Sequence, residues 1–144
     1  MSDLMSPASG RAYGSDGQVI HWAEFTEDLT VLASAERTAN INSPDQVNRV
    51  GRGCHVILNV TVRNDDSSIT LKIQGKDPVS EEYYDILEGS AVTSVSTNVY
   101  KVHPELTAEP NLVAKDLLPR TWRVRVEHDN TDTITYSVGA SVVR

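Results

Sequence analysis

Cysteine is almost absent from this sequence, because Cys54 is the only one in 144 residues. A single thiol excludes an intrachain disulfide and a zinc site built from cysteines. Cys54 alternates with Val56 and Leu58, so we expect it to be a small buried side chain without a chemical role. Aromatic residues make up only 6% of the chain, which leaves few rings for a sugar-binding platform.

The sequence also lacks a basic excess and long apolar runs. Its formal net charge is −7, whereas a nucleic-acid-binding surface needs a basic patch. The first ten residues, MSDLMSPASG, have no basic start and no apolar core, and no run approaches the length of a membrane span. We therefore expect no direct contact with nucleic acid, no signal peptide and no membrane segment.

Motifs that bind metals are missing as well. None of the histidines belongs to an HxH, HxxxH or HExxH pattern, so a metal site would have to be assembled from distant loops. The histidines are His21, His55, His103 and His128. We interpret His55 as a solvated strand residue, and His103 and His128 as surface residues.

The carboxylates and glycines give no catalytic pattern. Adjacent carboxylates occur at 65–66 and 81–82, but two glycosidase carboxylates must flank one bond, and neighbours on a strand point to opposite faces. The GRG at 51–53 is not followed by Lys-Ser or Lys-Thr, as a phosphate loop requires. We predict no catalytic residue, no bound metal and no cofactor, in a protein that is not an enzyme.

Alternating apolar residues are what the sequence has in abundance. Apolar side chains recur at every second position in 54–63, 68–75, 121–128 and 133–143, and polar turn residues separate the runs. A period of two predicts strands with one buried and one solvated face. The turns at 64–67 and 129–132 are rich in Asn and Asp, which favour tight turns.

The remaining segments complete a prediction of seven or eight short strands. We expect strands at about 29–38, at 83–88 and near 91–102, where the alternation slips around Val99 and Tyr100 and suggests a bulge. This pattern predicts an all-β fold, a single jelly-roll-like β-sandwich over 29–144. Residues 1–28 are interpreted as an arm that is flexible unless a partner orders it.

Two groups of side chains are candidates for an interface. Arg123 and Arg125 project from the solvated face of their strand. They either form a solvated surface that keeps the sheet soluble or bind an acidic neighbour. Arg120 lies just before them. Trp22 and Phe25 either cover the core of their own domain or anchor it to another subunit.

One set of motifs resembles a family of tailed-phage virion proteins over roughly residues 29–143. Its members share a Thr-Leu-x-Val/Ile-Gln strand followed by Asp and an aromatic residue, then Leu-Pro-Arg-x-x-Arg-Val, and a Ser-Val-Gly ending. The matching positions here are Thr70, Leu71, Ile73, Gln74, Asp77, Tyr84, Asp85, Leu118, Pro119, Arg120, Arg123, Val124, Ser137, Val138 and Gly139. The departures, at 65–68 and 81–82, fall in turns.

The resemblance implies a capsid decoration (cement) protein that stabilises the head of a phage. Its partner would be the major capsid protein, it would assemble as a homo-oligomer with a trimer favoured, and it would be made in the host cytoplasm and reside on the virion surface. The family offers no catalytic residues to transfer. Two alternatives stay open: a tail or neck component of the virion, and a glycan- or ligand-binding sandwich.

Overall fold

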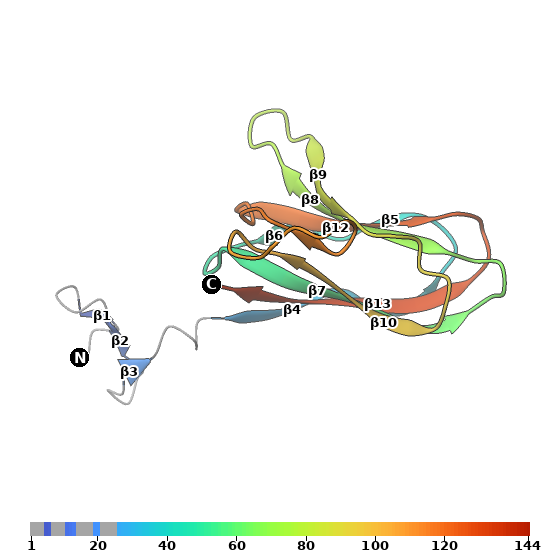
Figure 1. Cartoon of the computed structure of the whole chain (residues 1–144), viewed down its shortest axis with the longest axis horizontal. Coiled ribbons are helices and arrows are strands. Elements are labelled where there is room, and N and C mark those ends of the chain that lie inside the picture. Colours follow the sequence, from blue (N-terminus) through green and yellow to red (C-terminus); the bar gives the residue numbers. More distant parts are fainter. Residues whose placement is uncertain (1–4, 7–10, 14–18, 21–25) are drawn as a thin grey trace.

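The computed structural model of the protein describes residues 5–6, 11–13, 19–20 and 26–144. Within these ranges every regular element is a strand, and two five-stranded sheets pack on each other (Figure 1). The predicted all-β fold and β-sandwich are therefore confirmed. The described residues include no helix able to cross a membrane.

The first sheet combines strands from both ends of the sandwich sequence. In spatial order it contains β11 (Val113–Ala114), β10 (Ser96–Val102), β7 (Gly53–Arg63), β13 (Ile134–Val143) and β4 (Glu27–Arg37). All its pairs are antiparallel except β10 with β11. The C-terminal strand β13 lies between β7 and β4, so it joins the two halves of this sheet.

The second sheet is built around β12 and β8. Its order is β5 (Ile41–Asn42), β12 (Thr121–His128), β8 (Ile69–Lys76) and β9 (Tyr83–Glu88), and β6 (Gln46–Val47) also pairs with β12. The short strands β5, β6 and β11 lie in segments for which the sequence predicts no strand. The sequence around these two-residue elements has no alternation. Pairing with longer neighbouring strands imposes their strand conformation instead.

The predicted arm, 1–28, falls largely outside the described residues. Within it, β1 (Met5–Ser6), β2 (Arg11–Tyr13) and β3 (Val19–Ile20) pair with one another in antiparallel fashion. The strand expected from about Leu29 is β4, which begins at Glu27.

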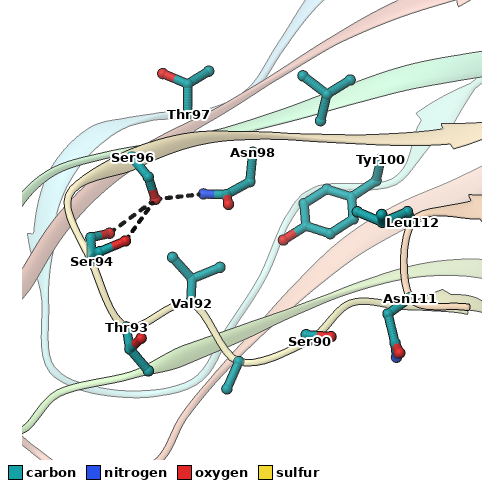
Figure 2. A pocket seen from close by; sticks show the side chains of 12 residues that line it. Ser90, Val92, Thr93, Ser94, Ser96, Thr97, Asn98, Tyr100, Asn111 and Leu112 are labelled. Atoms are coloured by element: carbon teal, nitrogen blue, oxygen red, sulfur yellow. Dashed lines mark hydrogen bonds between the residues drawn. The ribbon is translucent and has the colours of Figure 1, made fainter.

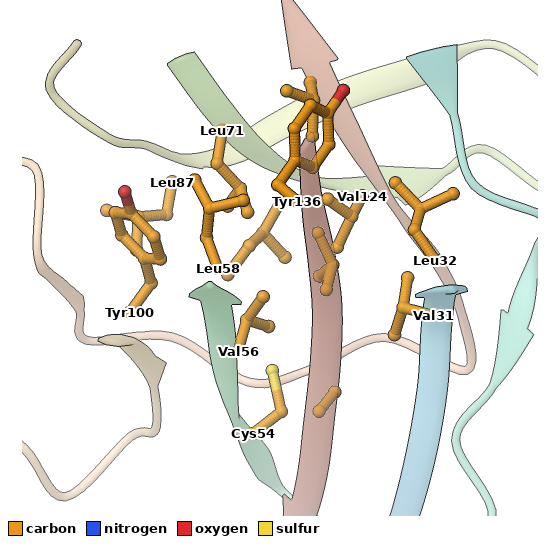
Figure 3. Close-up of a cluster of buried hydrophobic side chains, with 14 of the residues drawn as sticks. Val31, Leu32, Cys54, Val56, Leu58, Leu71, Leu87, Tyr100, Val124 and Tyr136 are labelled. Atoms are coloured by element: carbon orange, nitrogen blue, oxygen red, sulfur yellow. The ribbon is translucent and has the colours of Figure 1, made fainter. Parts of the chain in front are cut away.

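The core consists of the inward-facing residues that the alternation predicted, with one exception. Val62, expected on the buried face of 54–63, is 59% exposed, because the pairing of β7 with β13 shifts register beside it. Trp122 and Tyr136 are its largest fully buried side chains. Cys54 is buried beside Val56 on β7 (Figure 3), and burial raises the pKa of its thiol to about 12. The expected burial of Cys54 is thus confirmed, and a thiol that stays protonated at neutral pH is a poor nucleophile.

The bulge expected near Val99 and Tyr100 is absent. β10 pairs with β7 in unbroken register, with Val99 opposite Ile57 and Tyr100 opposite Val56. The alternation slips in the sequence for a different reason: apolar Val99 is on the outer face, while polar Asn98 occupies an inner position.

Register shifts occur elsewhere: between β8 and β9, between β7 and β13, and between β4 and β13. In the last of these pairs two register shifts occur around Val138, and they turn backbone carbonyls out of the ladder. The guanidinium of Arg37 fills this opening: Nη1 donates to the carbonyl of Tyr136 at 2.7 Å and Nη2 to that of Ala33 at 2.6 Å. Its Cζ also lies 4.7 Å from the centre of the Tyr136 ring.

His128 approaches the other end of Tyr136. Its Nε2 lies 2.8 Å from the Tyr136 hydroxyl, which is a hydrogen bond whose donor depends on the histidine tautomer. Burial, and then the charge of Arg37, lowers the pKa of His128, while Asp129 acts in the opposite direction. Burial also lowers the pKa of His55, with help from Lys101.

These two histidines predict a loss of stability in mild acid. Because their folded-state pKa values lie below the ordinary value of 6.5, the unfolded chain binds more protons below that pH. The stabilisation is complete above about pH 6.5 and is lost as the pH falls through the folded-state values. We expect the Tm to fall between about pH 7 and about pH 5, and His128→Gln to reduce the fall. Identical pH profiles for the two proteins would contradict this assignment.

Candidate interaction surfaces

The outer face of the second sheet carries mostly charged side chains, together with polar Gln74 and Tyr83. We call it the charged face. Alternation along three adjacent strands turns these residues outward. They are Arg123, Arg125, Glu127, Lys72, Gln74, Lys76, Tyr83 and Asp85.

Arg123 has two partners within the chain. Its Nε donates to Oε1 of Gln74 at 2.8 Å, and its Cζ lies 3.4 Å from the centre of the Tyr83 ring. The Tyr83 hydroxyl donates to Asp45 at 2.7 Å, and Lys76 lies 3.0 Å from the same carboxylate. The hydrogen bond from Tyr83, followed by that from Lys76, lowers the pKa of Asp45 despite partial desolvation.

Arg125 belongs to a second group on the charged face. Its Nη1 donates to Asn42 at 2.8 Å, and its Nε lies 3.2 Å from Glu127. Lys72 bridges Glu127, at 3.0 Å, and Asp85, at 3.6 Å. The hydrogen bond with Lys72 lowers the pKa of Glu127 and raises that of Lys72. The Arg125 guanidinium is therefore already bound by side chains of its own chain.

The five candidate interface residues are not brought together. Arg123 and Arg125 share the charged face, two positions apart on β12. Arg120 is exposed in the loop before β12, where its carbonyl accepts a hydrogen bond from the Asn48 amide. Trp22 and Phe25 lie outside the described residues.

The outer face of the first sheet has a different composition. Two adjacent cross-strand rows contain no charged residue, and we call them the uncharged face. One row is Thr97, Asn59 and Ser137, and the other is Val99, Ile57, Gly139 and Thr30. Charged residues stand at the edges of the rows on either side: Lys101 and Asp28 in one, and Glu36, which pairs with Thr135, in the other.

Gly139 lies near the centre of the uncharged face. A Cβ built there would have only the Leu29 carbonyl oxygen near it, at 3.7 Å, which is an ordinary contact. Packing therefore does not explain why this position has no side chain. Ile57, directly opposite on β7, is left half-buried rather than covered.

A hollow of about 370 Å³ opens at the edge of the sandwich, beside β10. The connection from β9 to β10 and the turn before β11 form its other walls (Figure 2). None of its lining residues is charged: Ser90, Ala91, Val92, Thr93, Ser94, Ser96, Thr97, Asn98, Val99, Tyr100, Asn111 and Leu112.

Polar groups without partners face this hollow. Tyr100 is only 2% exposed, yet its hydroxyl has no hydrogen-bond partner among the described residues and points into the hollow (Figure 2). The amide nitrogen of Asn98 donates to Ser96 at 3.1 Å, which leaves its oxygen as an acceptor. A Cβ at Gly89 would lie 2.6 Å from the Tyr100 ring, so glycine there makes room for the ring.

The sequence carried one signal for this hollow. The inward positions of β10 are, in order, Ser96, Asn98, Tyr100 and Val102. The first two are polar, although apolar residues are the rule at inward positions. Two inward polar residues in a row indicate a wet space next to the strand. The same slip predicts a bulge, because alternation alone does not distinguish a shifted register from a polar cavity.

His55, His103 and His128, the histidines that the structure describes, belong to no metal-binding group. Among the described residues no group of three or more His, Cys, Asp or Glu could hold a metal ion. The interpretation of His103 as a surface residue is wrong: it is 9% exposed, because its ring packs at the end of the first sheet. Its Nδ1 accepts from the Glu105 amide at 3.1 Å, so Nε2 donates to the Arg144 carbonyl at 2.9 Å.

Comparison with known proteins assigns this chain to no family. No protein-family model matches the chain, and no curated protein sequence does. Among solved structures, the chain is similar to one in the structure of infectious bursal disease virus Gt strain, with a TM-score of 0.43 and 7% identity. The alignment covers 82% of this chain and 33% of that one, so the chain spans about a third of its length.

Proposed function

We propose that this protein is a structural component of a tailed-phage virion that decorates the outer surface of the capsid shell. The observation that carries the proposal is the contrast between the two outer faces of the sandwich. The charged face is engaged by its own ion pairs, whereas the uncharged face offers small polar and aliphatic side chains. Depletion of charge is typical of the centre of a protein–protein interface. The sequence motifs that resemble virion proteins supply the partner, the major capsid protein.

Physical reasoning supports a sandwich in this role. A rigid β-sandwich that bridges neighbouring capsid subunits adds a contact at each joint of the shell. Because the shell repeats, a modest affinity per contact is multiplied by avidity when the protein oligomerises. A closed trimer on a three-fold axis would present three uncharged faces at once.

Co-sedimentation with purified capsid shells tests the proposal. We expect saturable binding at many copies per shell, with expanded shells favoured over unexpanded ones. Binding of only a few copies would indicate a tail or neck position instead. Failure of the full chain to bind either kind of shell would overturn the proposal.

Substitution at Gly139 tests the role of the uncharged face. Gly139→Glu is expected to weaken binding to shells about tenfold or more, because it buries an unpaired charge in the interface. Gly139→Ala is the matched control, since a Cβ fits there without a clash, and it should bind as the wild type does. Both variants should stay folded by circular dichroism. Equal binding by Gly139→Glu and Gly139→Ala would show that another surface makes the contact.

A further inference from the structure

We infer that the hollow beside β10 is a docking groove for an extended, uncharged peptide segment, which adds a strand to the first sheet next to β10. The partner is taken to be a subunit of the shell, so the inference rests on the proposed function and adds a second contact to it. Unpaired backbone along the β10 edge carries the argument, and the lining of the hollow agrees with it.

The outer edge of β10 is only half used. The amides of Lys101 and His103 donate to carbonyls of Leu112 and Ala114, at 2.9 and 3.1 Å. Backbone groups two positions apart in a strand point to the same side, so Thr97 and Val99 turn their N–H and C=O toward this edge too. β11 pairs only with Lys101 and Val102, and no described strand reaches Thr97 or Val99. Their donors and acceptors repeat at the spacing of another strand.

The hollow lies directly beside this free edge of β10. It lies against the same residues, and its far wall is the connection that contains Val92, held in place by two hydrogen bonds with Ile69. The groove ends at Asn111, whose side chain donates to the Glu88 carbonyl at 3.0 Å and whose φ of 64° forms the turn before β11. The open edge spans 96–99, about 13 Å of strand.

The lining determines the kind of segment that fits. With no charged residue in the groove, a charged side chain would lose its hydration without gaining a partner. The Tyr100 hydroxyl, which has no hydrogen-bond partner among the described residues, and the Asn98 oxygen line the groove beside the position of one inward side chain of the added strand. A small polar side chain such as Ser or Thr would satisfy both groups.

Proline at Val99 is the sharpest test. Its side chain is 40% exposed and its N–H bonds to no described group, so Val99→Pro removes the donor that pairs with the peptide without breaking the β10–β7 ladder. We expect Val99→Pro to bind expanded shells about tenfold more weakly than the matched Val99→Ala. If Val99→Pro does not fold, Ala91→Arg fills the groove, and Val95→Arg, on the same connection but outside the groove, is its control.

Hydrogen exchange on the bound protein gives a second measure. The amides of Thr97 and Val99 should exchange rapidly in the free protein and become protected on the shell. Val99→Pro and Ala91→Arg binding as well as their controls, with both amides unprotected in the wild type, would overturn the groove and leave the proposed function standing. No binding by the wild type would overturn both. N-acetylglucosamine that shifts the Asn98 and Tyr100 amide resonances would instead make the hollow a saccharide site and overturn the peptide.

Discussion

Replacing Trp122 with alanine should destabilise the sandwich by about 3–5 kcal/mol, the cost of emptying the space of a large core aromatic. Trp122 is 0% exposed on β12, where it pairs with Gly75 of β8 on one side and Gln46 of β6 on the other. Strands on both sides hold its backbone, so the core is poorly able to collapse into the cavity. A loss of this size is a large part of the stability of an ordinary domain.

Phenylalanine at the same position separates volume from polarity. The Trp122 Nε1 is buried and has no hydrogen-bond partner within the part of the chain that the structure describes, and such a group costs about 1–3 kcal/mol. Trp122→Phe removes that unsatisfied N–H, which stabilises the fold. It also removes part of the ring, which destabilises the fold by leaving a smaller cavity. We expect its loss to be well below that of Trp122→Ala in denaturant titrations. Similar losses for the two variants would show that the cavity term does not dominate.

Gly53→Ala is expected to be the second most damaging of these changes, at about 1–3 kcal/mol. A Cβ on Gly53 would lie 2.1 Å from the backbone oxygen of Val102 and 2.8 Å from the His103 ring. Backbone cannot rotate away as a side chain can, so β7 and β10 must move apart at this end. Thermal and denaturant unfolding measure the loss.

Gly139→Ala is the matched control for this prediction. Both glycines lie in central strands of the first sheet, yet an added Cβ would clash with a neighbouring backbone only at Gly53. At Gly139 the added methyl group should be neutral or stabilise the fold by about 0.4–1 kcal/mol, through the entropy of the unfolded chain. If both alanines cost the same, strand propensity rather than crowding would be the cause.

The sequence predicted the long strands well, because burial of one face imposes a period of two. The runs at 121–128 and 133–143 correspond to β12 and β13 within one residue. Alternation likewise placed Arg123 and Arg125 on an outer face.

The arrangement of neighbouring strands was beyond such a prediction. Nothing local in the sequence indicates that Arg123 stacks on Tyr83, or that Gln74 lies between Arg123 and Asp85, since these contacts depend on which strands pair and in what register. The groove depends on the same information: it exists because β11 is too short to cover the edge of β10.

The central position of β13 has a consequence for synthesis. The first sheet needs β13 between β4 and β7, and β13 is the last of these strands to leave the ribosome. Until then β4 and β7 have no partner on their facing edges. Ala140 of β13, for example, pairs with Leu29 and Val56, which lie 111 and 84 positions earlier in the chain. The sandwich must therefore close after translation of its last strand, and nascent chains shorter than this carry open strand edges that a chaperone can recognise.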